Sequence, residues 1–256
     1  MRICIKIGSN VLSRKDGSLD VTRLSALVDQ VAELRREGHE VLIVSSGAVA
    51  CGRSMLYHRE DLRTKDTVDE RQLFAAVGQA KLIDRYYELF REHQMVVGQV
   101  LTMKENFASD QHRETQRNCM EVMLRNGVLP IINENDAVCV TELMFTDNDE
   151  LSGLVARMMN CQRLIILSNI DGIYTGNPAD TSSELIHRVA EGENLQRYIQ
   201  TEKSSLGRGG MQSKCHTAQE VAASGIEVII ANGKREQVLT HIMADPDSVP
   251  CTIFSV

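Results

Sequence analysis

Two lysines near opposite ends of the sequence, each close to glycine, have the chemistry needed to handle a phosphate group. Lys6 is followed closely by Gly8, and Lys214 follows the glycines of the segment 207–214. A lysine ammonium supplies a point charge to an oxygen that gains negative charge, and a glycine lets backbone N–H groups approach a phosphate closely. The two segments therefore predict an anion site suited to phosphoryl chemistry.

The second of these segments differs from the phosphate-binding loop of P-loop proteins. Its sequence is Gly207-Arg208-Gly209-Gly210-Met211-Gln212-Ser213-Lys214. The P-loop order of Gly-x-x-x-x-Gly-Lys-Ser/Thr is absent, because Lys214 is separated from Gly210 and no serine or threonine follows it. A helix that starts after these glycines would still present free N–H groups to an anion. The segment thus argues against the P-loop fold but remains consistent with phosphate binding.

Three clusters of small or polar residues stand between the two lysines. Segment 45–50, small residues that lead into a predicted helix, could bind an anion or simply pack tightly. Segment 133–136 is a polar group in which Asp136 could pair with a cation such as the amino group of an amino acid, or it is an ordinary Asn- and Asp-rich turn. In segment 147–149 one residue can cap a helix, and the others could orient lysines, hold a magnesium-bound nucleotide or contact a substrate.

The elements that must position these residues alternate along the chain. Short apolar runs predict strands at Arg2–Ile7, Val41–Ser45, Met95–Leu101, Val128–Ile132, Arg163–Ser168 and Val228–Ala231. Helical spacing predicts helices from Leu24 to Leu34 and at Gln72–His93, Asp110–Asn126, Asp149–Met159 and Met211–Ser224. This order is typical of βαβ units and a mostly parallel sheet, in which ligands bind at the carboxyl ends of the strands. The fold class is therefore α/β.

Two segments are not assigned to the sheet or its helices. Met55–Glu70 is polar and lacks periodicity, so it is either a lid that closes on ligands or a solvated connection. Glu134–Phe145 is expected to be a loop that leaves the sheet. No repeat, low-complexity tract or linker divides the sequence, so we expect one domain over residues 1–256.

Composition narrows the class of ligand and the setting of the protein. The formal net charge is −7, which argues against a basic surface for nucleic acid. No apolar run reaches the roughly 20 residues of a membrane span, and the N-terminus is too short and charged for a signal peptide, so we expect a cytoplasmic protein that binds small ligands. The seven cysteines and seven histidines show no metal-ligand spacing, and no protein-held metal is predicted.

Taken in order, the motifs resemble the glutamate 5-kinases, a branch of the amino acid kinase family. The resemblance spans nearly the whole chain and rests on segments 6–10, 45–48, Ala75-Ala76-Val77-Gly78-Gln79, 132–136, 147–149 and 209–214. It implies an αβα sandwich around a mostly parallel open sheet. It also implies ATP-dependent phosphorylation of the side-chain carboxylate of L-glutamate to L-glutamyl 5-phosphate, the first step of proline biosynthesis.

The resemblance also implies roles for particular residues. The catalytic set is Lys6 and Lys214 on the transferring phosphoryl group, with Asp149 holding both lysines. Glutamate would be bound by Ser46, Gly47, Asn133, Asp136 and Asn148. The nucleotide would be bound by Lys6, Gly8, Ser168, Asn169, Arg208, Gly209, Gly210, Met211 and Lys214. The sequence departs from the family at Ser168-Asn169, where Thr-Asp is usual, and at Arg208, where threonine is common.

Further expectations follow from the same resemblance. ATP and Mg²⁺ are the expected cofactors. L-Proline, which resembles cyclised glutamate, is an expected feedback inhibitor. The expected assembly is a homo-oligomer, either a dimer or a tetramer. The sequence ends at Val256 without the C-terminal PUA domain that many members carry. Functions attributed to that domain are therefore not expected here.

Two alternatives remain. One is a related kinase for N-acetylglutamate, aspartate or carbamate. Asp136 argues against N-acetylglutamate, because an acetylated amine is neutral and gains nothing from a buried anion. The other is a catalytically silent module that senses a nucleotide or proline. The presence of Lys6, Asp149 and Lys214 argues against that module.

Overall fold

The structure, a computed structural model, describes the backbone of residues 1–56, 67–138, 147–195, 198 and 210–255. Its main strands are β1 (Arg2–Ile7), β2 (Glu40–Ser45), β3 (Val97–Thr102), β4 (Leu129–Glu134), β5 (Arg163–Ser168), β9 (Glu227–Asn232) and β10 (Cys251–Phe254). Its helices are α1 (Ser9–Leu12), α2 (Val21–Arg36), α3 (Ala48–Leu56), α4 (Thr67–Glu92), α5 (Asp110–Arg125), α6 (Asn148–Met158), α7 (Met211–Ala222) and α8 (Val238–Ala244).

One eight-stranded sheet runs through the described residues in the order β3-β4-β2-β1-β5-β9-β10-β8, where β8 is the short strand Arg188–Val189. Its pairings are parallel except that of β10 with β9, which is antiparallel. β1 lies near the middle, with Lys6 in register with Val44 of β2 and Ile166 of β5. Parallel pairing brings the carboxyl ends of β1, β2, β4, β5 and β9 to one edge.

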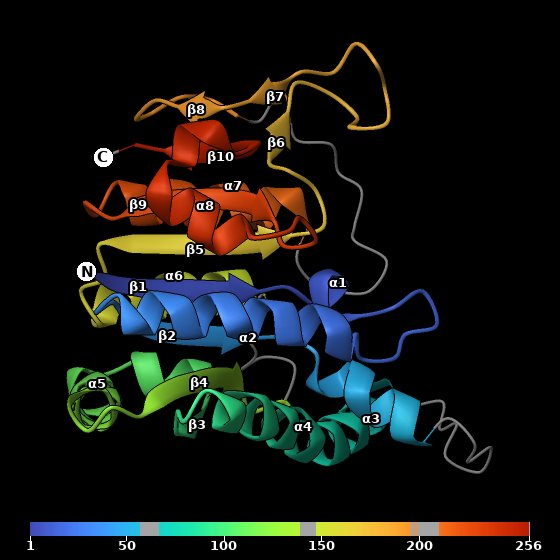
Figure 1. Ribbon diagram of the computed structural model, residues 1–256, viewed down its shortest axis with the longest axis vertical. Coiled ribbons are helices and arrows are strands. Elements are labelled where there is room, and N and C mark those ends of the chain that lie inside the picture. Colours follow the sequence, from blue (N-terminus) through green and yellow to red (C-terminus); the bar gives the residue numbers. More distant parts are fainter. Residues whose placement is uncertain (57–66, 139–146, 196–197, 199–209, 256) are drawn as a thin grey trace.

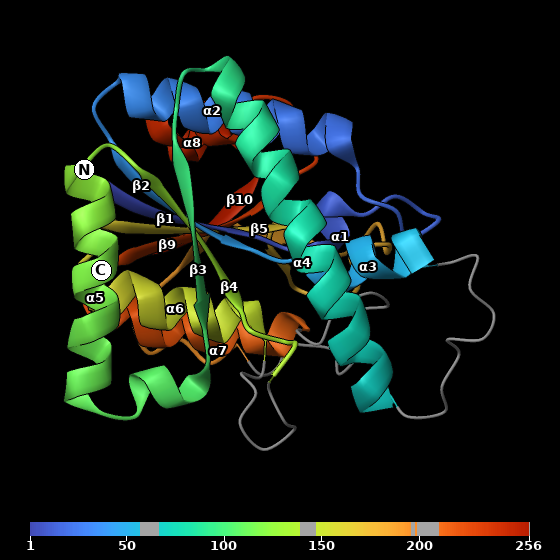
Figure 2. The same ribbon diagram turned by 90° about the horizontal axis from the view of Figure 1, so that it is seen from below.

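Helices cover both faces of this sheet (Figure 1 and Figure 2). One core packs α2, α4 and α8 against the sheet, and the other packs α5, α6 and α7 against the opposite face. Successive residues of a strand point to opposite faces, so Ile3, Ile5 and Ile7 enter the first core and Cys4 the second. Lys6 shares the alternation of Cys4, and its side chain therefore lies on the α6 and α7 side.

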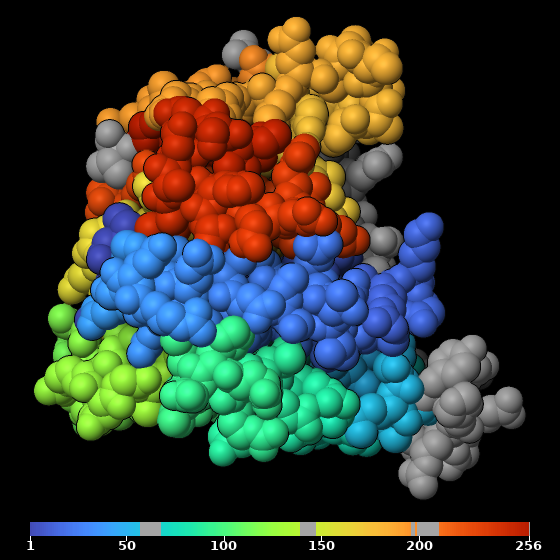
Figure 3. All heavy atoms as spheres, viewed as in Figure 1, coloured from blue at the N-terminus to red at the C-terminus, as the bar shows by residue number. Residues whose placement is uncertain are grey.

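The two halves of the chain occupy two ends of the sheet. In Figure 3 the blue and green N-terminal segments form one end of the molecule and the orange and red C-terminal segments form the other. β1 and β5 pair where the halves meet. A site at the carboxyl end of β1 can therefore be reached by residues from both halves.

The predicted strands and the five predicted helices are confirmed, with ends that differ by a few residues. The elements not predicted from the sequence are α1, α8, β8, β10 and the small hairpin of β6 (Ile173–Tyr174) with β7 (Leu185–Ile186). These elements are short. In addition, α8 begins after Gln237, which has a φ of 50°, and a backbone of this kind is usually signalled in the sequence by a glycine.

Parts of the two unassigned segments lie outside the described residues. Met55 and Leu56 end α3, Thr67–Glu70 is the first turn of α4, and the predicted lid between them falls on residues 57–66. The predicted loop after Glu134 is described only to residue 138. Among the helices with assigned positions, none has both the length and the apolar character that a bilayer crossing demands.

Two glycines let α3 and α4 pack directly on each other's backbone. A Cβ on Gly52 would lie 1.9 Å from the carbonyl oxygen of Phe74, and one on Gly78 would lie 1.8 Å from that of Ala48. Real Cβ atoms do not approach this closely, so any larger residue would force the helices apart. The contact fixes where α4 stands relative to the turn that precedes α3.

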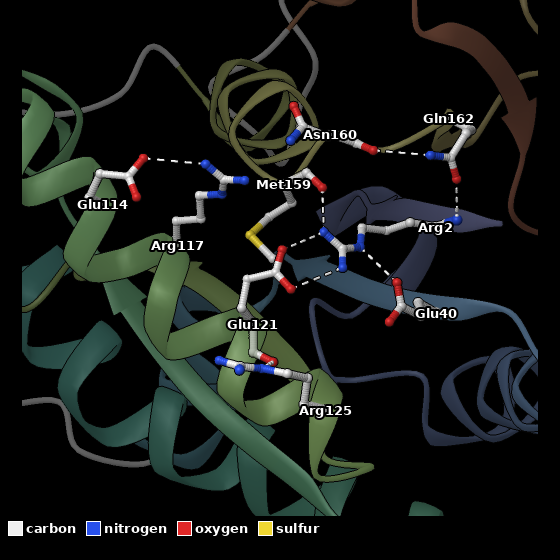
Figure 4. Close-up of polar contacts among 9 residues, drawn as sticks. All are labelled: Arg2, Glu40, Glu114, Arg117, Glu121, Arg125, Met159, Asn160 and Gln162. Carbon is white, nitrogen blue, oxygen red and sulfur yellow. Dashed lines mark hydrogen bonds and ion pairs between the residues drawn. The ribbon is translucent and has the colours of Figure 1, made fainter.

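At the amino-terminal end of β1, the guanidinium of Arg2 links this strand to three other elements (Figure 4). It donates to Glu40 of β2 at 2.9 Å, to Glu121 of α5 at 2.6 Å and to the carbonyl oxygen of Met159 after α6 at 2.6 Å. The hydrogen bond from Arg2, helped by the attraction of its charge, lowers the pKa of Glu121 below its usual value of 4.5 despite opposition from burial. The Glu121 carboxylate is therefore more stable in the folded protein than in the unfolded chain.

The Glu121→Gln variant should lose about 1 kcal/mol of unfolding free energy at neutral pH, because a charge-assisted bond becomes a neutral one. A depressed carboxyl pKa stabilises the fold above the unfolded value and ceases to do so as pH falls through the folded value. The deficit should therefore shrink in acid below about pH 4.5. Urea unfolding at pH 7 and at the lowest pH where both proteins fold measures it.

Glu114→Gln is the matched control, since Glu114 pairs with Arg117 on the same helix at 3.3 Å and is largely exposed. We expect a change within about 0.5 kcal/mol. A Glu121→Gln deficit that does not vary with pH would contradict the role of its charge.

Candidate functional site

A carboxylate between two lysine ammonium groups lies at the centre of the site. Asp149 Oδ1 pairs with Lys6 Nζ, and Asp149 Oδ2 accepts a hydrogen bond from Lys214 Nζ at 3.0 Å. The three residues are buried, with Asp149 fully inaccessible. These residues were expected to act together, and the structure brings them into contact. The trio carries one positive charge in excess, which favours an anion.

Three elements deliver this trio. Lys6 stands near the carboxyl end of β1 on the face covered by α6 and α7, Asp149 is in the first turn of α6, and Lys214 is in the first turn of α7. Asp147 caps α6 by accepting from the backbone N–H groups of Asp149 at 2.8 Å and Glu150 at 3.0 Å. The starts of both helices, where the helix dipoles are positive, are thus aimed at one place.

Burial and charge act on these groups in opposite directions. Burial raises the pKa of Asp149, but the attraction of Lys6 and Lys214 together outweighs it and leaves the pKa below its usual value. Burial, aided by repulsion from Lys214, lowers the pKa of Lys6 against the pull of Asp149. Burial and then the charge of Asp149 raise the pKa of Asp147. Asp149 is therefore the ionised anchor of the group.

A chain of amide hydrogen bonds continues from the trio. Asn148 Nδ2 donates to Ser46 Oγ at 2.8 Å and to Asn133 Oδ1 at 3.0 Å, and Asn133 Nδ2 donates to Gln79 Oε1 at 2.8 Å. The Asn148 Oδ1 atom is buried without a hydrogen-bond partner among the described residues. Buried acceptors are rarely left without a donor, so we expect a water molecule or a ligand to donate to this atom.

The turn that carries Ser46 and Gly47 is held in place by hydrogen bonds to neighbouring elements. Ser46 N donates to the carbonyl oxygen of Ile7 at 3.0 Å, and Gly47 has a φ of 110°, which side chains rarely tolerate. Tyr86 of α4 shares a buried hydrogen bond of 2.8 Å with Ser45, whose hydroxyl donates to the carbonyl oxygen of Ser46. Tyr86 was not predicted to support this turn, because helical spacing in the sequence marks it only as a core residue.

A second charged group lies at the end of β4. The guanidinium of Arg71, near the start of α4, binds the carboxylate of Asp136 and lies 3.8 Å from Glu134 Oε2. Asp136 and Glu134 are both buried. Asp136 was predicted from the sequence as a site residue, whereas Arg71 was not. Its only sequence signal is a cation at the edge of a predicted helix, and nothing local indicates its partner.

The residues expected to contact a nucleotide are only partly described. A Cβ on Gly8 would lie 3.1 Å from the carbonyl oxygen of Leu167 and 3.5 Å from Lys6 Nζ, so the glycine keeps open the space beside the ammonium. Gly210 precedes α7 without a side-chain cap, and Met211 is its first residue. Ser168 ends β5, next to β1, and Asn169 follows it, exposed. Arg208 and Gly209 lie outside the described residues.

A further polar cluster, also missed from the sequence, joins the ends of β5 and β9. Asp171 accepts from Arg235 Nε at 2.7 Å, from Arg235 Nη2 at 2.8 Å and from Asn232 Nδ2 at 3.1 Å. The hydrogen bond from Arg235 lowers the pKa of Asp171. The cluster holds the two strand ends beside Ser168 and Asn169.

No group of three or more histidine, cysteine or acidic residues is placed to hold a metal within the described ranges. Asp147 Oδ2 is, however, buried without a hydrogen-bond partner there. Magnesium at phosphoryl-transfer sites is commonly held by one or two carboxylates together with substrate phosphates. The Asp147 carboxylate fits that arrangement.

Known proteins resemble the chain in sequence and in fold. The amino acid kinase family profile matches residues 1–232. A glutamate 5-kinase of Bacteroides thetaiotaomicron is 61% identical over 253 residues, which cover 99% of this chain and 69% of that protein. A glutamate 5-kinase of Clostridium acetobutylicum is 38% identical over 94% of this chain and 90% of its own length. The chain spans about two thirds of the length of several other relatives with that name.

The solved structure of an isopentenyl phosphate kinase superposes with a TM-score of 0.68 at 16% identity over the full length of both chains. This likeness concerns the fold alone. It agrees with the expected αβα sandwich around a mostly parallel sheet.

Replacing Asp149 with asparagine should remove about 3–5 kcal/mol of unfolding free energy, because two buried ammonium groups lose their counter-charge. Adding Lys6→Met to Asp149→Asn should recover part of this loss, since only one uncompensated charge then remains. Urea unfolding at pH 7 measures both variants. Asp171→Asn, which disturbs a more exposed ion pair, is the control, with an expected loss of about 1 kcal/mol or less. A double variant no more stable than Asp149→Asn would contradict this account of the charges.

Proposed function

We propose that this chain, which belongs to the amino acid kinase family, transfers the γ-phosphoryl group of ATP to the side-chain carboxylate of L-glutamate. The product is L-glutamyl 5-phosphate, and the reaction is the first step of proline biosynthesis. The observation that carries the proposal is the buried trio in which Asp149 holds Lys6 and Lys214 at one place. The high identity to glutamate 5-kinases supports the choice of acceptor.

The reaction needs charge neutralisation more than it needs a base. Glutamate's side chain has a pKa of about 4.3 and is ionised at neutral pH, so the nucleophile is ready. One of its oxygens forms a bond to the γ-phosphorus, the bond from that phosphorus to the β–γ bridging oxygen breaks, and ADP leaves with the electron pair. Both reactants are anionic, and catalysis therefore rests on positioning and electrostatics.

Lys6 and Lys214 meet this need. Their ammonium groups reach the place where the γ-phosphoryl oxygens lie during transfer, and Asp149 keeps them fixed, so no reorganisation is required as charge shifts. The backbone at Gly8, Gly210 and Met211 approaches the phosphates. Ser168 and Asn169, together with Arg208 and Gly209, complete the nucleotide side in the proposal.

On the other side, amides and carboxylates hold glutamate. Ser46 and Gly47 form the turn that receives the reacting carboxylate, and Asn148, fixed by Asn133, presents its unpartnered oxygen to a ligand donor. Asp136 binds the α-ammonium group of glutamate. Ser46, Asn133 and Asp136 are buried.

Magnesium, when bound with ATP, supplies further positive charge to the phosphates. Asp147 is the residue that would hold it, through the Oδ2 atom described above. The capping of α6 by the Oδ1 atom of Asp147 leaves Oδ2 for this purpose.

The proposal extends to regulation and assembly. Proline keeps the amino and carboxyl groups of glutamate, so it would compete for Asp136. We also propose that residues 1–256 form one domain, and that the protein acts in the cytoplasm as a homo-oligomer. Strands from Arg2 to Phe254 that join in a single sheet support the single domain.

An ADP-release assay with L-glutamate, N-acetylglutamate, aspartate and carbamate, each with and without Mg²⁺, tests the function. We expect magnesium-dependent turnover with L-glutamate and a product that hydroxylamine traps as a hydroxamate, the reaction of an acyl phosphate. Turnover with N-acetylglutamate but not with glutamate would point to a related kinase. Binding of ATP without turnover on any acceptor would point to a silent sensing module.

Lys214→Ala should lower kcat by about 10²–10³-fold, or roughly 3–4 kcal/mol of barrier, because one contact to the developing charge is lost. The Lys6–Asp149 pair stays balanced in this variant, so the fold should persist. Steady-state kinetics with saturating glutamate and varied ATP measure kcat and KM. Lys81→Ala, which removes a surface partner of Asp84, is the control and should be unchanged. Normal kcat with a raised KM for ATP would contradict the role in transfer.

A further inference from the structure

The ion pair of Arg71 with Asp136 stands in the part of the site where the proposed function places the α-carbon of glutamate. The guanidinium binds Asp136 directly and lies 3.8 Å from Glu134 Oε2. The Arg71 side chain is 21% exposed, whereas those of Asp136 and Glu134 are 11% and 2% exposed. A cation is therefore partly buried against the carboxylate proposed to bind the substrate ammonium group.

We propose that Arg71 is a specificity-determining residue that binds the α-carboxylate of the substrate, so that Arg71 and Asp136 together recognise the zwitterionic end of an α-amino acid. The inference rests on the proposed function and deepens it. It adds a residue for which neither the sequence motifs nor the fold supplies a role.

Charge complementarity is the first argument. An α-amino acid carries an ammonium and a carboxylate on the same carbon, so its own charges form an adjacent pair of opposite sign. The pair of Arg71 and Asp136 has the same form, and the two pairs can join with each charge next to an opposite one. A guanidinium also matches a carboxylate through two parallel N–H donors.

Repulsion is the second argument. A substrate carboxylate brought beside Asp136 would, without Arg71, face the carboxylates of Asp136 and Glu134, which share its sign. Like charges in a partly buried place are strongly unfavourable, because little water screens them. Binding an amino acid at Asp136 therefore requires a cation for its other charge, and among the described residues Arg71 is a cation in contact with Asp136.

The position of Arg71 is set by the packing of α4. Gly78 of α4 meets the backbone of α3 at Ala48, directly after the Ser46–Gly47 turn. Gln79, about two helical turns after Arg71, accepts the hydrogen bond from Asn133 of β4. Figure 2 shows α4 running beside the end of β4. The helix is held against both substrate-binding segments, so Arg71 is delivered by a fixed element.

Two substrate analogues separate the two charges of the zwitterion. 4-Aminobutyrate is glutamate without the α-carboxylate, and glutarate is glutamate without the ammonium group, yet both keep the reacting carboxylate. The wild-type enzyme should use glutamate much better than either. Arg71→Gln should reduce kcat/KM for glutamate by roughly 30–100-fold, mainly through KM, because a charge-assisted contact to substrate is lost. It should leave kcat/KM for 4-aminobutyrate within about threefold of wild type.

Three companion measurements make this result specific. Arg71→Lys, which keeps the charge but loses the fork of donors, should recover part of the activity on glutamate. Arg85→Gln, on the same helix but paired with Glu88 near the surface, is the matched control and should change neither substrate. Thermal unfolding of each variant, without ligand, shows whether the fold is intact.

The outcomes distinguish this inference from the function beneath it. A wild-type protein that does not turn over glutamate overturns the proposed function, and the inference with it. With an active wild type, equal losses on glutamate and 4-aminobutyrate would show that Arg71 merely supports the pocket. Tighter glutamate binding in Arg71→Gln would show that Arg71 competes with the substrate ammonium group. Either result would overturn the inference alone.

Discussion

The ion pairs of Asp149 with Lys6 and Lys214 constrain much of the remaining structure. Buried lysines are unfavourable unless a counter-charge lies in contact, and here one carboxylate serves two of them. To bring them together, β1 must lie centrally with its even-numbered side chains facing α6 and α7, and both helices must begin at that edge. The cap from Asp147 secures one of those starts. The outcome is a fixed pair of ammonium groups in a protein whose formal net charge is −7.

The two ends of the site have opposite electrostatic character, as the proposed reaction requires. The lysine trio suits the transferring phosphoryl group, while the carboxylates of Glu134 and Asp136 suit a cationic group at the far end of the acceptor. A dicarboxylic amino acid presents a free carboxylate at one end and a zwitterion at the other. In the proposed reaction, charge therefore orients such a substrate, with its free carboxylate toward the lysines.

Local sequence patterns predicted much of the fold. They did not predict pairs of residues that lie far apart in the sequence. β1 and β5 are runs of apolar residues, and the parallel-sheet rule then predicted that Lys6 would lie at an edge used by ligands. β10 and β8 were missed because strands so short carry little periodicity. Arg71 was missed for another reason, since its pairing with Asp136 depends on the approach of α4 to β4. Whether Met55–Glu70 forms a lid remains a prediction, because its central residues lie outside the described ranges.

Asn148 joins the two ends of the site, and its place in the chain explains how. It is the neighbour of Asp149, so the first turn of α6 carries both the anchor of the lysines and the amide that reaches Ser46 and Asn133. The proposed phosphoryl end depends on α6 and α7, whereas the proposed acceptor end depends on α3 and α4, which pack closely at Gly52 and Gly78. In-line transfer requires the two ends to keep a fixed separation. The hydrogen bonds from Asn148 to Ser46 and Asn133 link the start of α6 to the turn before α3 and to the end of β4.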